Sequence, residues 1–345
     1  MARPWIASRA GPVALEPVRG HKIDSEMKVI PLVFVSAALA AWPAAGQVKI
    51  TPGPEKISIE IDGRPFTDFY VAGPDVTKPY LWPLRAASGT YVTREWPMEK
   101  VAEEESIRNP DHKHQRGLWF AHAWVNHLDF WNNEASYTTP NRGKIVLQKV
   151  DDIKSGSDKG SIIATFDWTN LAGAKLLTET RLMTFYADPK LRTIDLDVKL
   201  TALETATFGD EKDGLLGIRM RPVLQEQGGT GHITNADGAV GEKALWGKPS
   251  HWCDYSGEVN GEKVGVAILD NPGNPRPVRW HARSYGLFAA NPFGLATFTG
   301  DKSQSGALTL EPGQSLRLRY RVIIHPGDAQ TAGIAAQWDK YIAAK

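Results

Sequence analysis

The stretch LLTETRLMTFYADPKLRTIDLDVKLTAL, residues 176–203, decides the fold. Its second half alternates apolar and polar side chains, which is the two-residue period of a β-strand with one buried face. The apolar face of that strand would hold Ile194, Leu196, Val198 and Leu200. The sequence Asp188-Pro189-Lys190 between the two halves is typical of a turn. We therefore predict a long antiparallel hairpin.

The same period recurs outward from this hairpin. Residues 56–62 alternate strictly. Further candidate strands lie at residues 145–150, 161–168, 215–220, 264–269, 278–282, 295–299, 307–310 and 316–324. Turn residues separate them at short intervals, as in a sandwich or barrel. Only residues 332–342 repeat apolar side chains at helical spacing, with Asp328 as a candidate cap. The pattern predicts an all-β fold for residues 47–345, a single large antiparallel β-sandwich with a short C-terminal helix.

Two charged residues of the first hairpin strand, Glu179 and Arg181, point to the same side of that strand. Two interpretations fit them. They form an ion pair on the solvent face, or they form part of the wall of a concave sheet.

The N-terminal region has the pattern of a secretory signal peptide. Lys28 precedes an apolar run at residues 29–41, and small residues follow it. We predict cleavage after Gly46, an unstructured extension before the signal, and a secreted or periplasmic protein. Met27 is a candidate for the true start. A membrane anchor or a buried helix is the alternative, although the run is short for a membrane span.

Composition excludes several classes of protein. The 345 residues include 40 Lys plus Arg and 39 Asp plus Glu, a net charge of +1. This balance argues against a nucleic-acid partner or a polybasic membrane-surface protein. The single cysteine allows no intrachain disulfide and no thiolate metal cluster. After removal of the signal we expect no membrane partner, and the oligomeric state stays open.

The histidines cluster in the segment DHKHQRGLWFAHAWVNHLDFW, residues 111–131. On an extended chain His112, His114, Arg116 and His122 point the same way. Such imidazoles could transfer protons on a sugar, with Arg116 holding an oxyanion. They could also bind a divalent transition metal, for which His112, His114 and His122 are the candidate ligands. A rim of exposed histidines beside a buried aromatic strand is the third interpretation.

Three other segments mix aromatic and polar residues: GDEKDGLLGIR at 209–219, WCDYSG at 252–257 and RWHARSYGLFAANPFG at 279–294. Aromatic faces stack on sugar rings while charged side chains bind the hydroxyls, so the combination favours a sugar ligand. Each segment alone is also compatible with an ordinary loop. The sequence contains no nucleophile elbow, phosphate-binding loop, dinucleotide-binding motif or helical zinc-peptidase motif.

These segments, together with LEPGQSLRLRYRVIIHPGDA at 310–329, resemble the soluble PmoA family of bacterial proteins, a domain of unknown function. The resemblance covers nearly all of residues 50–343. It implies a secreted or periplasmic protein linked to sugar catabolism. The ending is similar to that of galactose-mutarotase-like supersandwich proteins, which implies a concave sugar-binding face. One departure is Gln115, which stands where the family has the second of two paired histidines.

The sequence thus favours a secreted carbohydrate-active enzyme that uses acid–base chemistry on a sugar or glycoside, as an epimerase, lyase or hydrolase. The candidate catalytic residues are His112, His114, His122, His281 and Asp210. The candidate substrate-binding residues are Arg116, Trp119, Trp131, Arg219, Trp252, Asp254, Arg283, Tyr285 and Asn291. No cofactor is assigned beyond the candidate divalent metal. Two alternatives stay open: a non-catalytic glycan-binding module, and the metal-dependent oxygenase or hydrolase that the family name suggests.

Overall fold

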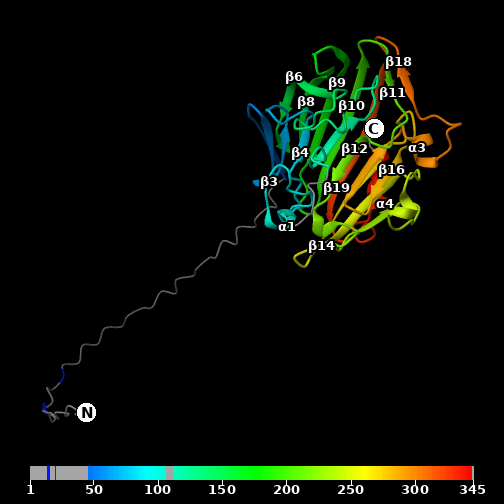
Figure 1. Ribbon diagram of the computed structural model, residues 1–345. Coiled ribbons are helices and arrows are strands. Elements are labelled where there is room, and N and C mark those ends of the chain that lie inside the picture. The colour runs from blue at the N-terminus through cyan, green and yellow to red at the C-terminus, as the bar shows by residue number, and fades with distance from the viewer. Residues whose placement is uncertain (1–13, 16–19, 21–45, 106–111, 344–345) are drawn as a thin grey trace, which may run out of the picture. The chain divides into compact units, whose positions relative to one another are not determined.

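The computed structural model describes residues 14–15, 20, 46–105 and 112–343 (Figure 1). The apolar run at residues 29–41 and the candidate start Met27 lie outside the described residues. Export of the chain therefore stays a prediction. Among the helices of the described part of the chain, none is long and apolar enough to cross a membrane.

Two large antiparallel sheets make up the fold (Figure 1). The first has nine strands in the order β16-β17-β12-β5-β4-β3-β2-β1-β7. Their bounds are Arg279–Arg283, Leu287–Asn291, Gly214–Arg219, Leu118–His122, Tyr80–Trp82, Arg64–Tyr70, Lys56–Ile61, Gln47–Pro52 and Gly156–Ser157. Every strand pairing of this sheet is antiparallel.

The second sheet has eight strands in the order β13-β14-β15-β19-β10-β9-β8-β6. Their bounds are His232–Asn235, Trp252–Val259, Glu262–Asp270, Ser315–Pro326, Arg192–Ala202, Lys175–Tyr186, Lys159–Asn170 and Gly143–Lys154. A separate two-stranded ribbon pairs β11 (Ala206–Phe208) with β18 (Leu308–Leu310). The short helical elements are α1 (Ala102–Glu105), η1 (Pro222–Leu224), α2 (Glu242–Leu245) and α3 (Leu295–Thr299). The predicted large antiparallel β-sandwich is confirmed.

The predicted hairpin is β9 followed by β10, which pair along their whole length. Ile194, Leu196, Val198 and Leu200 of β10 are all buried, as the alternation indicated. The carboxylate of Asp188 closes the turn, because its Oδ1 accepts hydrogen bonds from the backbone N–H groups of Lys190 and Leu191 at 2.7 and 2.8 Å. The two-residue period therefore set the faces of the hairpin correctly.

Glu179 and Arg181 lie inside the sandwich and not on a solvent face. Both side chains are buried, on the same face of the sheet as Val198 and Leu200. Nε of Arg181 lies 2.6 Å from Oε1 of Glu179, and Nε1 of Trp168 donates to Oε2 of Glu179 at 2.8 Å. The guanidinium also packs against three phenylalanine rings, those of Phe69, Phe120 and Phe166. These contacts join β9 to both sheets.

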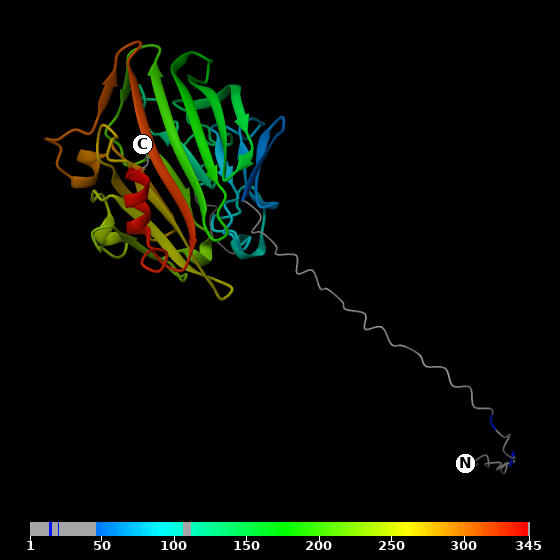
Figure 2. The ribbon, with the colours of Figure 1, turned by 180° about the vertical axis from the view of Figure 1, so that it is seen from behind.

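The predicted C-terminal helix is α4, which spans Ile334–Ala343. Figure 2 shows it on the outer face of the eight-stranded sheet. Ile334 and Tyr341 pack there with Ile323 of β19 and with Leu269 of β15. Asp328 does not cap this helix. Its Oδ1 accepts from the N–H of Thr331 at 2.7 Å, in the turn before the helix begins.

The predicted strand at residues 295–299 is wrong, because these residues form helix α3. The carboxylate of Asp210 accepts hydrogen bonds from the N–H groups of Ala296 and Thr297 at 2.8 and 3.0 Å. It thereby binds the free N–H groups at the start of the helix. A residue 85 positions upstream supplies these contacts, and the local alternation of apolar residues does not report them.

The buried ion pair yields a stability prediction. Glu179→Ala leaves the Arg181 guanidinium unpaired between the sheets, and it should lower the free energy of unfolding by about 3–5 kcal/mol. The double variant Glu179→Leu/Arg181→Met should lose much less, because it removes both charges. Urea unfolding of the three proteins measures the difference. A loss below about 1 kcal/mol in Glu179→Ala would contradict the role given to the pair.

Candidate active site

The outer face of the nine-stranded sheet carries a polar cavity at its β16-β17-β12-β5 end. Register sets which side chains reach this face. Trp119 pairs with Gly217, Gly217 with Ala289, and Ala289 with His281, so the four lie in one row across β5, β12, β17 and β16. The residues between them point inward: Phe120, for example, packs on Trp168 of the other sheet. The row therefore faces away from the core of the sandwich.

Glycine at position 217 makes room for two indoles, that of Trp131, which lines the cavity, and that of Trp119 behind it. A Cβ atom there would lie 2.7 Å from Cη2 of Trp131 and 2.8 Å from Cζ2 of Trp119. Those two indoles contact each other edge to face, with centroids 4.9 Å apart. Any larger residue at 217 would displace them, so the glycine is needed for close approach and not for an unusual backbone angle.

The cavity has a volume of about 170 Å³. Its walls come from three segments and one strand. The segment before β5 contributes His112, His114 and Gln115, and the segment after it contributes Trp131 and Asn132. The loop before β12 contributes Lys212 and Asp213. Strand β16 and the turn that follows it contribute His281, Arg283 and Tyr285. We call this space the central cavity. It combines three imidazoles, two cations, one carboxylate and two aromatic rings.

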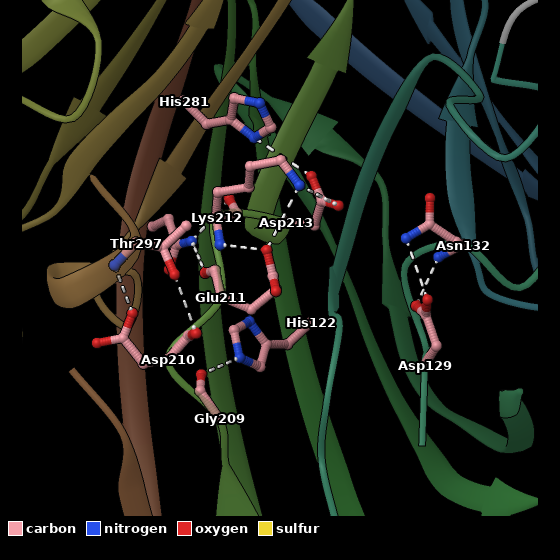
Figure 3. Close-up of polar contacts among 11 residues, drawn as sticks. His122, Asp129, Asn132, Gly209, Asp210, Glu211, Lys212, Asp213, His281 and Thr297 are labelled. Atoms are coloured by element: carbon pink, nitrogen blue, oxygen red, sulfur yellow. Dashed lines mark hydrogen bonds and ion pairs between the residues drawn. The ribbon is translucent and has the colours of Figure 1, made fainter. Parts of the chain in front are cut away.

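His281 and Asp213 form one side of the central cavity (Figure 3). Nδ1 of His281 lies 3.5 Å from Oδ1 of Asp213. Burial lowers the pKa of His281 to about 4, although the Asp213 carboxylate opposes the shift. The ring of Trp246 supports the imidazole edge to face at 5.1 Å. His281 is therefore a neutral imidazole near pH 7.

His112 and His114 also line the central cavity. Burial, helped by the charges of Arg219 and Arg94, lowers the pKa of His112 to about 4. Its ring stacks on Tyr285, with centroids 5.4 Å apart and an interplanar angle of 8°. Burial and the nearby charge of Lys78 also lower the pKa of His114 well below its ordinary value. Nδ1 of His114 lies 3.1 Å from the hydroxyl of Tyr137.

Three imidazole nitrogens of His114 and His281 are buried without a hydrogen-bond partner among the described residues. They are Nε2 of His114 and both Nδ1 and Nε2 of His281, although Nδ1 of His281 lies 3.5 Å from the carboxylate of Asp213. Buried polar atoms in native proteins are rarely left in this state. A neutral imidazole has one donor and one acceptor nitrogen, so the two Nε2 atoms are suited to a polar ligand.

The cations of the central cavity are Lys212 and Arg283. Nζ of Lys212 lies 3.2 Å from Asp213 and 3.4 Å from Glu211 (Figure 3). Burial lowers the pKa of Lys212, but these carboxylates more than offset that effect, and the net shift is upward. The guanidinium of Arg283 lies over Trp246 and over Tyr285, 5.2 Å from each ring, and Nε is 3.0 Å from Glu242. Both side chains are charged near pH 7.

Six of the predicted site residues line the central cavity, and two more lie directly behind it. The six are His112, His114, Trp131, His281, Arg283 and Tyr285. Trp119 supports Trp131. Arg219 lies 4.6 Å from the ring of Tyr285 and donates to Oε1 of Gln115. Gln115, the departure from the resembled family, thus belongs to the wall of this site.

His122 is on the wrong face for the predicted role. It lies on the same side of β5 as Phe120, which packs between the sheets. Nε2 of His122 hydrogen-bonds the carbonyl of Gly209 at 2.9 Å (Figure 3). The ring of His122 packs against Phe293. The extended chain assumed from His112 to His122 does not exist, because residues 112–114 form a turn.

The candidate metal site fails for the same reason. His122 does not join His112 and His114, because it points to the other face of the sheet. In the described ranges, no group of three or more His, Cys, Asp or Glu side chains is arranged to hold a metal ion. The predicted metal ligands therefore do not fit a common ion.

Asp210 and Arg116 have structural roles. Asp210 caps helix α3 and also accepts from the N–H of Gly306 at 2.6 Å. Arg116 is held by Glu134, with Nε 3.1 Å from Oε2, and by the hydroxyl of Tyr80 at 3.4 Å. A guanidinium bound at both ends in this way fixes the 116 and 134 segments and does not line the cavity.

Trp252 and Asp254 belong to the other sheet. Both lie on β14, and Trp252 packs in the cluster beneath α4. The carboxylate of Asp254 is fully buried and lies 2.6 Å from Nε2 of His325. Neither residue is among those that line the central cavity.

Asn291 positions the loop that carries Lys212, one of the two cations of the central cavity. Its Nδ2 donates to the carbonyls of Glu211 and Lys212 at 2.7 and 2.8 Å. It is fully buried, and it acts through the 211–213 loop and not by contact with a ligand. Sequence reasoning missed four lining residues, Gln115, Asn132, Lys212 and Asp213. The acidic segment at 209–219 indicated that a carboxylate of this loop belongs to the site, but we predicted Asp210 and not Asp213.

An antiparallel β-sandwich with an imidazole-lined cavity on one outer face is the class of protein that this geometry defines. The chain belongs to the family of unknown function DUF6807, which matches residues 56–339. No curated protein matches the chain. The resemblance to the soluble PmoA family stays a prediction.

Several solved structures are similar to this chain at low identity. They include a galactose mutarotase related enzyme from Lactobacillus acidophilus, with 9% identity, a TM-score of 0.35, and coverage of 81% of this chain and 97% of that one. A candidate aldose 1-epimerase from Klebsiella pneumoniae has 10% identity, a TM-score of 0.39 and coverage of 86% of both chains. The GH36 α-galactosidase AgaA from Geobacillus stearothermophilus has 10% identity, a TM-score of 0.38 and coverage of 81% of this chain. This chain spans only 40% of that α-galactosidase. At TM-scores below 0.5 these likenesses say nothing about the chemistry of the cavity.

The protonation state of His281 predicts how stability depends on pH. Between pH 6.5 and about 4 the unfolded chain binds a proton at this residue and the folded chain does not, because the folded pKa is about 4. The folded state therefore loses stability as pH falls through this window. In His281→Gln that loss should be smaller by about 1.4 kcal/mol per pH unit.

Urea unfolding at several pH values between 4 and 7 measures the effect. The matched control is His232→Gln, at an exposed histidine on β13. Equal slopes for His281→Gln and the natural protein would show that His281 is not held neutral by the fold.

Proposed function

We propose that this protein is a carbohydrate-active enzyme whose central cavity transfers protons on a sugar ring. One observation supports the proposal above others: neutral imidazoles, cations and aromatic rings converge in a single cavity. Neutral imidazole is the form of histidine that accepts a proton, and it is maintained here by burial. A lining of this composition is suited to a sugar, in agreement with the sequence resemblance to galactose-mutarotase-like proteins.

His281 is the candidate general base. Oδ1 of Asp213 lies 3.5 Å from Nδ1, so we assign proton transfer to Nε2, the other ring nitrogen. A carboxylate beside one ring nitrogen orients the imidazole and stabilises the cation that forms when the other nitrogen takes a proton. His114 is the candidate partner on the second wall, since its Nε2 is also buried and available among the described residues.

Lys212 and Arg283 favour reactions that develop negative charge on oxygen. Epimerisation and β-elimination both begin with loss of a proton from a carbon next to a carbonyl or carboxyl group, and negative charge then builds on that oxygen. Fixed cations in a partly dry cavity stabilise such an oxyanion. We therefore place epimerase or lyase activity before hydrolase activity for this site, and we expect a sugar with a carbonyl or carboxylate group.

Trp131 and Tyr285 provide apolar walls for the ring itself. Both are lining residues, and each is held rigidly, Trp131 by Trp119 and Tyr285 by His112 and Arg219. Rigid aromatic walls with a few fixed polar groups are typical of small-molecule sites. They orient the sugar so that its reacting C–H bond faces an imidazole.

Proton abstraction can be tested without knowing the natural substrate. The protein would be incubated in D₂O with a panel of aldoses, ketoses and uronates, and exchange of C–H protons followed by ¹H NMR. We expect exchange next to a carbonyl or carboxyl group of at least one sugar. His281→Gln should slow this exchange by at least about 100-fold, the usual scale of general-base catalysis.

The control is again His232→Gln, which should exchange at the natural rate because this exposed side chain is not among those that line the central cavity. Sugars that bind without exchange or turnover would contradict the proposal and would favour the glycan-binding module. Glycoside cleavage without C–H exchange would instead favour the hydrolase.

A further inference from the structure

The central cavity is small for a complete ligand site. Its volume of about 170 Å³ lies below the roughly 300–1,000 Å³ of ordinary ligand pockets. Two larger pockets adjoin it, and each shares one lining residue with it. Arg283 is common to the central cavity and a pocket of about 650 Å³. Asn132 is common to the central cavity and a pocket of about 590 Å³.

The first of these, the Trp246 pocket, combines two carboxylates, two cations and an indole. Its lining residues are Glu226, Val240, Gly241, Glu242, Lys243, Trp246, Arg283 and Ser284. Its indole also touches the imidazole of His281, at 5.1 Å between ring centroids. One side chain thus forms a wall of the pocket and supports the candidate base in the next cavity. The Trp246 pocket therefore neighbours the central cavity through Arg283, the side chain that lines both spaces.

The carboxylates of the Trp246 pocket are fixed by backbone groups. Oε2 of Glu226 accepts from the N–H of Glu242 at 3.0 Å. Oε2 of Glu242 accepts from the N–H of Ser284 at 2.7 Å. Oriented carboxylate oxygens beside a half-buried indole are the groups that bind the hydroxyls and the C–H face of a sugar ring.

The second pocket, the Tyr137 pocket, has a different lining of hydroxyls, amides and one carboxylate. It includes Asp129, Asn132, Tyr137, Thr138 and Asn141. The hydroxyl of Tyr137 lies 3.1 Å from Nδ1 of His114, which lines the central cavity. Asp129 holds Asn132 through its side-chain amide at 3.1 Å and its backbone N–H at 2.7 Å (Figure 3). The Tyr137 pocket is therefore in contact with His114, a candidate catalytic residue, through the hydroxyl of Tyr137.

We propose that the substrate is an oligosaccharide, with its reacting unit in the central cavity and its neighbouring units in the Trp246 and Tyr137 pockets, an inference that rests on the proposed function of the cavity. The enzyme would then act on a unit within a chain and not on a free monosaccharide. The fixed carboxylates and the indole make the Trp246 pocket the stronger of the two flanking subsites.

Binding as a function of chain length tests this inference. Isothermal titration calorimetry would compare monomers, dimers and trimers from two series, neutral cello-oligosaccharides and acidic oligogalacturonides, followed by a broad array of immobilised mono- and oligosaccharides. We expect trimers of at least one series or array family to bind at least about tenfold more tightly than the monomer, since a second stacked unit contributes on the order of 1 kcal/mol or more.

Two variants separate the subsite from general folding. Val240→Arg places bulk and charge in the Trp246 pocket at a side chain that is 61% exposed. It should reduce the trimer-to-monomer ratio of affinities to within about threefold, which is a loss of most of that tenfold advantage. The matched control is Val146→Arg on edge strand β6, at a side chain 41% exposed, which should leave the ratio unchanged.

The outcomes distinguish this inference from the proposed function. Equal affinity for monomers and trimers, or a ratio untouched by Val240→Arg, would overturn the flanking subsites even if monosaccharides exchange protons. Length-dependent binding without proton exchange would support the subsites and contradict the enzyme. An array on which no oligosaccharide binds better than its monomer would also overturn the inference.

Discussion

Side chains on a β-strand point alternately to the two faces of a sheet, and in the middle of the nine-stranded sheet the two faces have different tasks. On β5 and β12 the inward residues, such as Phe120 and Leu216, fill the space between the sheets. The outward residues, Trp119 and Gly217, lie behind Trp131, which lines the central cavity. A register slip of one residue would exchange the two sets, so formation of the sandwich and formation of the site are one event.

Burial at this face also sets the chemistry. His112 and His281 lie among Lys212, Arg219 and Arg283, where a further positive charge is costly, and their pKa values fall to about 4. The same burial costs stability in acid, because the unfolded chain binds protons that the folded chain excludes. The folded protein therefore keeps these imidazoles unprotonated near neutral pH, and it loses stability in acid as a consequence.

The sequence predicts the sandwich well because strand periodicity is local. Residues 176–203 show the hairpin and its buried face without reference to the rest of the chain. It predicts the site in part, because two segments are visibly rich in polar and aromatic residues. One contains His112 and His114, and the other contains His281, Arg283 and Tyr285. Which residues of a loop reach the cavity depends on contacts far away in sequence. Asp210 caps a helix formed by residues 295–299, and Asp213, three positions later, faces His281.

His122 shows the same limit from another direction. We predicted that His122 points the same way as His112 and His114, which requires an extended chain between them. Residues 112–114 form a turn, so the prediction does not hold. Asn291 could not be assigned from sequence because it acts on the backbone of the 211–212 loop, some 80 positions upstream. Both errors concern long-range contacts, which alternation within a strand does not encode.

The site histidines stay neutral because the outer face of the sheet buries them. Long-range ¹H–¹⁵N correlation spectra of the imidazoles, recorded between pH 4 and 7.5 and assigned with single histidine variants, report this directly. His112 and His281 should remain neutral until the pH approaches about 4. Protonation of both rings near pH 6.5, the ordinary value for histidine, would contradict the account.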